Sequence, residues 1–204
     1  MSKSSTPNHI GFIPDGNRRW ALMRGLTKEA GYAHGIPPAL LLYEECKNLG
    51  IKEISVFCFT QDNTKRPTIQ KEAFINATTA FAHEISQRGA SLLVLGDEDS
   101  SLFPGVLKEF RQRKGSGIKV NLLVNYGWEW DLVGLKNGEL YSHDISRIDL
   151  IVRWGGRCRL SGFLPVQSVY ADIYVRDEYW PDYQPFHFKE ALAWFKIQDR
   201  TLGG

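Results

Sequence analysis

Short apolar segments alternate with amphipathic segments along most of the chain. Apolar runs typical of strands occupy residues 10–13, 53–59, 91–95, 120–124, 149–153 and 169–175. Apolar positions at helical spacing and helix-boundary residues predict helices over residues 36–49, 69–88, 102–113 and 188–200, with shorter helices opening at residue 17 and within residues 125–131 and a turn over residues 31–35. Because strands that alternate with helices usually form parallel sheets, the pattern predicts an α/β fold with an open, mostly parallel β-sheet flanked by helices.

The predicted helix over residues 69–88 has one apolar face, formed by Phe74, Ala77, Phe81 and Ile85. Such a face normally packs in the core. It also mixes large and small side chains and adjoins the polar Thr78, which would suit a channel for a hydrocarbon ligand. Periodicity alone favours the core interpretation.

Arginines occur in three loops that follow predicted strands, over residues 17–19, 63–66 and 153–161. Because the carboxyl ends of parallel strands meet at one edge of a sheet, we expect these loops to surround one cleft. Guanidinium groups bind phosphate oxygens through paired hydrogen bonds, and hydroxyl groups add further donors. One such loop alone would be interpreted as solvated surface, but the three together predict a site for two anionic groups.

The stretch IGFIPDGNRRW, residues 10–20, places Asp15 on a Pro-Asp-Gly turn just before two of these arginines. A divalent cation would reconcile a carboxylate with bound diphosphates, since Mg²⁺ is usually held by one or two carboxylates together with substrate phosphates. The alternative is a turn acid and two surface arginines at the start of a helix. Taken alone, this stretch favours neither interpretation.

The composition predicts one domain. The 204 residues, 43% of them hydrophobic, suffice for one sizeable core without a linker, so we expect a single domain over residues 1–204 with residues 1–8 as a flexible arm. A formal net charge of +2, spread along the chain, argues against a nucleic-acid partner. Three widely spaced cysteines and an N-terminus without an apolar signal segment lead us to expect a reduced, cytoplasmic protein.

Common nucleotide, hydrolase and zinc motifs do not occur in the sequence. There is no Walker A motif, no GxGxxG after a predicted strand and no GxSxG. The five histidines form no HExxH motif and no close cluster, so each is more typical of a surface or structural position than of a zinc ligand. These features argue against an NTPase, a Rossmann dehydrogenase and a zinc enzyme.

Several longer motifs occur in order from His9 to Gly204. They read HIGFIPDGNRRWA, FTQDNTKRP, NYGWEWD, DLIVRWGGRCRLSGFLP, YADIYV and a terminal GG. Together they resemble the cis-prenyltransferase family, whose familiar member is undecaprenyl diphosphate synthase. The resemblance implies a homodimer whose parallel sheet encloses an apolar tunnel. It also implies condensation of isopentenyl diphosphate with an allylic diphosphate, with Mg²⁺ as the cofactor and peripheral membrane contact through a lipid product.

The same resemblance assigns roles to individual residues. Asp15 would bind the metal and activate the diphosphate, with Asp172 as a second metal-binding carboxylate, while Asn63 and Thr60 would orient substrate or assist proton removal. Residues expected at the allylic diphosphate are Gly16, Asn17, Arg18, Arg19, Lys28, Tyr32 and Arg66. Residues expected at the diphosphate of the second substrate are Arg153, Arg159, Ser161 and Gly203. The tunnel would be lined by Phe74, Ala77 and Phe81.

The sequence also departs from the family pattern. Lys28 and Tyr32 stand where the family has arginine and histidine, which implies an altered allylic site because lysine is a point charge and tyrosine is neutral. Thr64 and Glu129 replace the tryptophan and arginine of two motifs. Thr201 replaces the arginine of a C-terminal motif that completes the neighbouring subunit's site in the family.

The chain is shorter than long-chain members after Pro67 and between residues 131 and 148, which implies a smaller tunnel and a short product. The Gly31-Tyr32 pair and the spacing of residues 161, 163 and 165 are similar to members that make lavandulyl-type branched diphosphates. The resemblance therefore implies a short-chain cis-prenyltransferase. Irregular coupling of two dimethylallyl units is one alternative, and a non-catalytic subunit of a heteromeric prenyltransferase is another.

Overall fold

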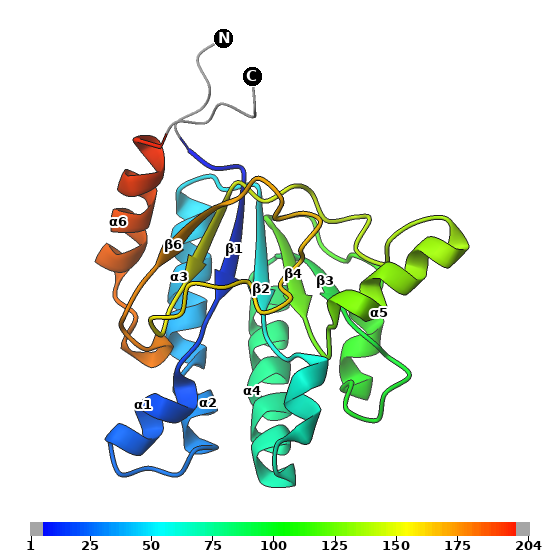
Figure 1. The fold of residues 1–204 in the computed structure, drawn as a ribbon, viewed down its shortest axis with the longest axis horizontal. Coiled ribbons are helices and arrows are strands. Elements are labelled where there is room, and N and C mark those ends of the chain that lie inside the picture. The colour runs from blue at the N-terminus through cyan, green and yellow to red at the C-terminus, as the bar shows by residue number, and fades with distance from the viewer. Residues whose placement is uncertain (1–5, 199–204) are drawn as a thin grey trace.

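A six-stranded, all-parallel β-sheet forms the framework of the computed structural model, which describes residues 6–198 (Figure 1). The strands lie in the order β3-β4-β2-β1-β5-β6. Their bounds are β1 (His9–Ile13), β2 (Glu53–Phe57), β3 (Ser91–Leu95), β4 (Lys119–Leu123), β5 (Leu150–Arg153) and β6 (Asp172–Val175). The predicted α/β class and parallel sheet are confirmed.

Helices connect most of the strands. The α-helices are α1 (Asn17–Met23), α2 (Ala30–Ala33), α3 (Ile36–Asn48), α4 (Thr68–Gln87), α5 (Trp128–Val133) and α6 (Pro185–Lys196). Short 3-10 helices cover Gln61–Lys65, Gly105–Phe110, Gly134–Asn137 and Trp180–Asp182. None of the helices in the described part of the chain is long and apolar enough to cross a membrane.

Two predicted elements are wrong in part. The helix expected over residues 102–113 is only the 3-10 helix Gly105–Phe110, in which Leu107 and Phe110 are buried at the three-residue spacing that suits this helix type. The turn expected over residues 31–35 is present only at residues 34–35, because residues 31–33 belong to α2, whose Gly31 lies so close to α1 that a Cβ atom would sit 2.2 Å from the carbonyl oxygen of Asn17.

The start of the chain is attached earlier than expected. Pro7 is buried, and the backbone of Asn8 accepts from Lys52 and donates to the Asp149 carboxylate at 2.7 Å. The predicted flexible arm over residues 1–8 is therefore wrong for its last residues, and residues 1–5 lie outside the described part.

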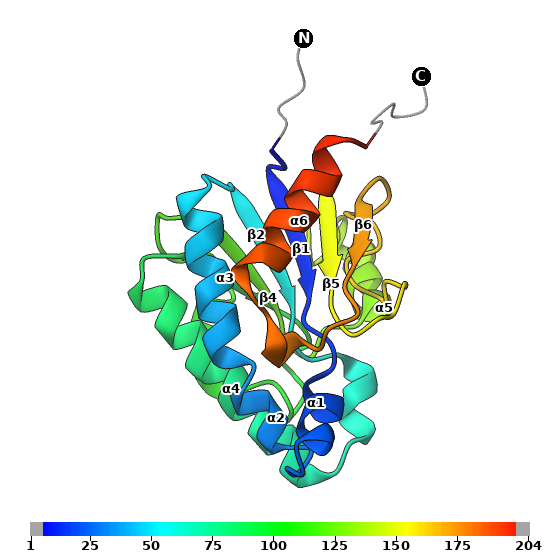
Figure 2. The same ribbon diagram turned by 90° about the vertical axis from the view of Figure 1, so that its left-hand side faces the viewer.

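Long helices cover one face of the sheet. Figure 2 shows α3, α4 and α6 lying over this face, where alternate strand residues such as Phe12, Val94 and Val152 join the larger apolar core. The opposite face is covered by segments between residues 126 and 168, through residues such as Tyr126, Ile148 and Phe163. Between residues 128 and 148 the only helices are α5 and the short 3-10 helix Gly134–Asn137.

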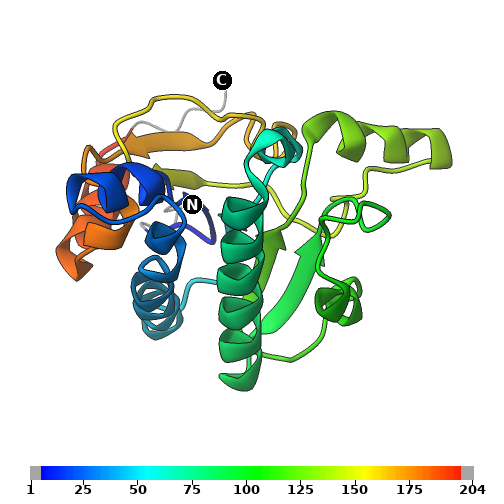
Figure 3. The same cartoon turned by 90° about the horizontal axis from the view of Figure 1, so that it is seen from below.

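The carboxyl ends of the strands meet short helices instead of a continuous layer. Seen from below, α1, α2 and the start of α4 surround this edge of the sheet (Figure 3). The chain leaves β1 at Ile13 and leaves β5 at Arg153, and these two residues are paired in register. Loops far apart in sequence are thereby brought to one place.

Candidate active site

A polar pocket of about 360 Å³ lies at the carboxyl ends of β1, β2 and β5. Four arginines and two aspartates line it, so cationic groups predominate. The charged lining residues are Asp15, Arg18, Arg19, Asp62, Arg66 and Arg153, and the other polar ones are Asn17, Tyr32, Thr60, Asn63 and Ser161. The predicted convergence of the three arginine-bearing loops in one cleft is confirmed.

Asp15 lines this pocket, two residues beyond the end of β1. Its backbone N–H donates to the carbonyl oxygen of Ile13, which turns the chain sharply out of the strand. Its carboxylate accepts a hydrogen bond of 2.9 Å from Arg153 Nη2 and lies 3.4 Å from Arg19 Nη2. The Asp15 side chain is one-third exposed, and both arginine partners also line the pocket.

Arg153 ends β5 and is buried, with only 4% of its side chain exposed. Its Nη1 donates to Ser161 Oγ at 3.0 Å and also to the carbonyl oxygen of Arg159. Ser161 has a left-handed backbone with φ of 53°, which directs its hydroxyl group toward the guanidinium. The predicted pairing of Arg153 with Ser161 in one site is present.

Arg19 faces the other oxygen of the Asp15 carboxylate, Oδ1. Its Nη2 donates to the carbonyl oxygen of Gly155 at 3.0 Å, and its guanidinium lies 4.8 Å from the centre of the Tyr179 ring. Gly16, with φ of 105°, leaves room for that ring, since a Cβ atom there would lie 2.5 Å from Tyr179 Cδ1. The tight turn therefore requires glycine.

Arg66 and Tyr32 form the side of the pocket near α2. Arg66 Nη1 donates to Tyr32 Oη at 3.0 Å. Burial lowers the pKa of Arg66 from its ordinary value, and nearby Arg18 adds to this effect. A guanidinium that has lost part of its solvation in this way would gain from contact with an anion. Asn63 donates from its side-chain amide to Thr60 Oγ1 in the same wall.

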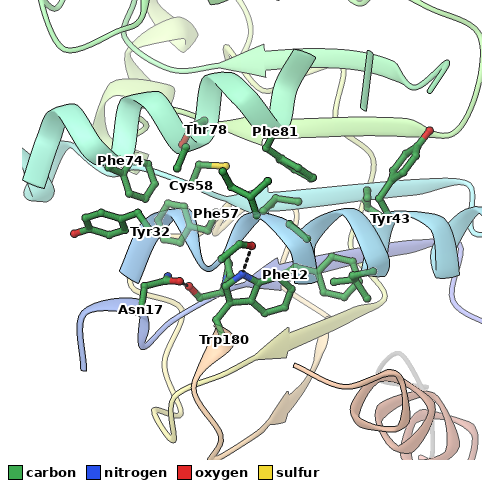
Figure 4. A pocket seen from close by; sticks show the side chains of 18 residues that line it. Phe12, Asn17, Tyr32, Tyr43, Phe57, Cys58, Phe74, Thr78, Phe81 and Trp180 are labelled. Atoms are coloured by element: carbon green, nitrogen blue, oxygen red, sulfur yellow. Dashed lines mark hydrogen bonds between the residues drawn. The ribbon is translucent and has the colours of Figure 1, made fainter. Parts of the chain in front are cut away.

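A smaller apolar cavity of about 90 Å³ continues from the polar pocket (Figure 4). Tyr32, Cys58 and Phe74 belong to the walls of both. Figure 4 shows Tyr32 and Phe74 at one end of the cavity and Tyr43 at the other, with side chains from α4 along its length. All three predicted tunnel residues line it, namely Phe74, Ala77 and Phe81.

Several lining residues were missed from the sequence. Asp62 lies inside a quoted motif and adds a second carboxylate to the polar pocket. Burial raises the pKa of the Cys58 thiol to about 12, so at neutral pH it is an uncharged group at the neck between the two cavities. Tyr43 and Trp180 come from distant segments, and no spacing in the sequence connects them with the tunnel residues.

Three predicted residues within the described part of the chain do not join this pocket. Lys28 is exposed beyond α1, and Arg159 contributes a carbonyl oxygen while its side chain is exposed. Asp172 begins β6 opposite Leu150, at the end of the sheet away from Asp15, so the two carboxylates cannot share a metal ion within one chain. Gly203 lies outside the described residues.

The pocket fits a metal ion only together with a ligand that brings its own oxygens. Within residues 6–198, no group of three or more histidine, cysteine or acidic side chains could hold an ion. Asp15 nevertheless faces a pocket that also holds four arginines. A single carboxylate plus diphosphate oxygens is a usual ligand set for Mg²⁺, whereas a closed zinc site would need more protein ligands.

Comparison with protein families gives one match that spans most of the chain. The sequence model described as "Putative undecaprenyl diphosphate synthase" matches residues 13–137 and 134–203. Among individual proteins, an isoprenyl transferase of Leptospira interrogans is 30% identical over 100% of this chain and 98% of its own length. A ditrans,polycis-undecaprenyl-diphosphate synthase specific for (2E,6E)-farnesyl diphosphate, from Vibrio parahaemolyticus, is 29% identical over 98% of this chain and 91% of its own length.

The fold is also found among solved structures. Lavandulyl diphosphate synthase from Lavandula x intermedia, in complex with dimethylallyl diphosphate, superposes with a TM-score of 0.83. The match covers 99% of this chain and 100% of that one, at 23% sequence identity. At this identity the likeness concerns the arrangement of the sheet and helices.

Proposed function

Because the chain belongs to the cis-prenyltransferase family that includes undecaprenyl diphosphate synthase, we propose that it is an Mg²⁺-dependent, short-chain prenyltransferase. It would join an allylic prenyl diphosphate to isopentenyl diphosphate, releasing inorganic diphosphate. The carbon–oxygen bond of the allylic diphosphate breaks as a new carbon–carbon bond forms, and a proton leaves the second substrate.

The observation that carries this proposal is the junction of a cationic pocket with an apolar cavity. The pocket of about 360 Å³ presents four arginines, and the cavity of about 90 Å³ that continues from it has aromatic and aliphatic walls. An amphiphile with a diphosphate at one end and a short hydrocarbon at the other matches this arrangement. The small volume of the cavity supports a short allylic chain.

The chain's own residues would act mainly by placing charge. Arg19 and Arg66 lie where they would bind the allylic diphosphate and stabilise the negative charge that develops on it as it leaves. Arg153 and Ser161 would bind the diphosphate of the second substrate. Mg²⁺ held by Asp15 and diphosphate oxygens would supply Lewis-acid stabilisation of the leaving group.

Asn63 and Thr60 would orient the reacting carbons or assist removal of the proton. They lie in the same wall and are hydrogen-bonded to each other. The neutral Cys58 thiol and the Phe74 ring at the neck keep water away from the carbon that becomes cationic.

Coupling of two dimethylallyl units is a second candidate, because the small cavity favours a five-carbon allylic group in either reaction. Purified protein with Mg²⁺ should be incubated with dimethylallyl, geranyl or farnesyl diphosphate, each with and without isopentenyl diphosphate. Diphosphate release with a new prenyl diphosphate is expected, and product from dimethylallyl diphosphate alone would identify irregular coupling. An absence of turnover on every combination would contradict the proposal.

We also propose a homodimer, as the family resemblance implies. Native mass spectrometry of the purified chain should give twice the monomer mass of 23.2 kDa. Activity that appears only with a co-purified second protein would instead support the non-catalytic subunit.

A further inference from the structure

Both oxygens of the Asp15 carboxylate face guanidinium groups. Oδ2 accepts from Arg153 Nη2 at 2.9 Å, and Oδ1 lies 3.4 Å from Arg19 Nη2. The two arginines come from different elements, Arg153 from the end of β5 and Arg19 from α1. The carboxylate is thus held between two positive charges.

This pairing competes with metal coordination. Mg²⁺ binds carboxylate oxygens at about 2.0–2.1 Å in near-octahedral geometry and keeps several further oxygen ligands around it. A guanidinium group 2.9 Å from the same oxygen occupies that space, and its charge repels the cation. While both guanidinium groups face Asp15, its affinity for a metal ion is therefore reduced.

The donors of Arg153 give independent evidence that this side chain suits a phosphate group. Its side chain is 4% exposed, and Asp15 is the one acidic group among its ion pairs in the described residues. Its Nε is buried and has no hydrogen-bond partner there. Nε and Nη2 point to the same side of the guanidinium, so one Asp15 oxygen fills half of a two-donor fork that a phosphate group would fill completely.

We propose that Arg153 and Arg19 form a latch on Asp15, and that diphosphate binding at Arg153 opens it so that Asp15 becomes free to bind the metal. The inference rests on the proposed function and adds to it the order in which diphosphate and metal bind. A diphosphate takes over the Arg153 fork, the carboxylate loses its stronger partner, and the metal site is completed only then. Activation of the allylic leaving group thus depends on the second diphosphate being in place, which limits wasteful hydrolysis.

Metal binding without any diphosphate tests the latch directly. Mn²⁺ alone is titrated into the full chain, and free Mn²⁺ is measured from its electron paramagnetic resonance signal. The wild type should bind weakly. Arg153→Gln should bind Mn²⁺ roughly two- to fivefold more tightly, the range expected for losing one partly exposed ion pair, and Arg19→Gln should show a smaller rise. When Asp15→Asn is added to Arg153→Gln or to Arg19→Gln, the increase in Mn²⁺ affinity should disappear.

A matched control separates the latch from general electrostatics. Arg18 lines the same pocket but is hydrogen-bonded to Gln70, at 3.3 Å. Arg18→Gln removes the same charge without touching Asp15, so Mn²⁺ affinity should stay nearly unchanged. An equal rise in Arg18→Gln and Arg153→Gln would overturn the latch. If Arg153→Gln does not fold, as judged by circular dichroism, the more exposed Arg19→Gln decides the comparison with Arg18→Gln.

The reciprocal experiment measures inorganic pyrophosphate binding by calorimetry with all metal removed. Asp15→Asn should raise pyrophosphate affinity more than Asp62→Asn, because both aspartates line the pocket but only Asp15 competes for Arg153. Equal effects would overturn the latch. Neither experiment requires turnover. If the protein is an active prenyltransferase but shows none of these affinity changes, only the latch is refuted. If the affinity changes occur in a protein without turnover, only the proposed reaction is refuted.

Discussion

Gly16 shows how one residue fixes the geometry of the pocket. It combines a left-handed backbone with contact against the Tyr179 ring, which in turn supports Arg19. A side chain at this position would strain the backbone and push the ring away. The arginine and the neighbouring Asp15 would then lose their positions.

We predict that Gly16→Ala lowers the free energy of unfolding by about 2–4 kcal/mol, combining left-handed strain with a steric clash. Turnover and diphosphate affinity should fall with it. Gly25→Ala is the matched control, because Gly25 also has a positive φ, of 69°, but nothing lies within 4 Å of the added Cβ. It should cost about 1–2 kcal/mol and preserve activity. Thermal melts and the coupling assay check both, and equal losses of activity would contradict the steric argument.

At the residue scale, sequence patterns identified donors better than their partners. The arginine-bearing loops, Asp15 and Ser161 could be predicted because they follow strands whose ends must meet. The ion pair between Asp15 and Arg153 could not be predicted, since it depends on the register of β1 with β5. Asp172 was assigned by resemblance, and the register places it at the wrong end of β6.

At the scale of elements, α4 divides its apolar face between two tasks. Phe74 and Ala77, near its start, are half-buried and line the cavity, while Ile85 is fully buried in the core. Phe81 lies between them and does both. Periodicity predicted the helix and its face well, but a cavity wall and a core have the same spacing, so the sequence could not separate them.

We predict that Phe81→Leu enlarges the cavity and shifts the products toward longer chains, at a cost of about 1–2 kcal/mol in unfolding free energy. Ile85→Val, one turn along the same helix and outside the cavity wall, should cost about 0.5–1.5 kcal/mol without changing the products. Mass spectrometry of the products, with denaturant melts, compares the two. The same product distribution in both variants would exclude Phe81 as a limit on chain length.

Local signals were least informative where elements are short. Residues 102–113 have a helix-like distribution of apolar positions, and Phe103, Leu107 and Phe110 reach the core, yet the backbone tightens to a 3-10 helix. Two predicted strands, 53–59 and 169–175, extend beyond β2 and β6, because strand propensity does not show where a neighbouring strand ends. The long helices α3 and α4, which have strong boundary signals, were within one residue of their predicted bounds.

At the scale of the whole molecule, the sheet carries polar groups at both ends. Opposite the pocket, near the strand starts, a buried network links His9, Glu53, Ser55 and Asn121. His9 Nδ1 lies 3.0 Å from the carbonyl oxygen of Ser146, so it carries the hydrogen, and Nε2, 2.9 Å from Ser55 Oγ, is the acceptor. Burial lowers the pKa of His9 from its ordinary value, although Glu53 and Asp149 oppose this.

We predict that the protein loses stability as the pH falls below about 6.5, the ordinary pKa of histidine. The folded pKa is lower than the unfolded one, so the unfolded chain binds more protons and the contribution of His9 is complete only above that value. His9→Asn, which retains a donor for Ser146, should flatten the decline between pH 7.5 and 5.5 in urea melts. His143→Asn, at an exposed position, should leave it unchanged. Parallel slopes in all three proteins would rule out His9 as the cause.

The central position of β1 has a consequence for how the protein is synthesised. Asp15 and Arg153 are 138 residues apart, and β5, which positions Arg153, is separated from β1 by most of the chain. A growing chain on the ribosome therefore carries β1 with one side unpaired until β5 has emerged. Contacts at such separation slow folding. The nascent chain can pack α3 and α4 early. It cannot bind diphosphate through both Arg19 and Arg153 until β5 has emerged.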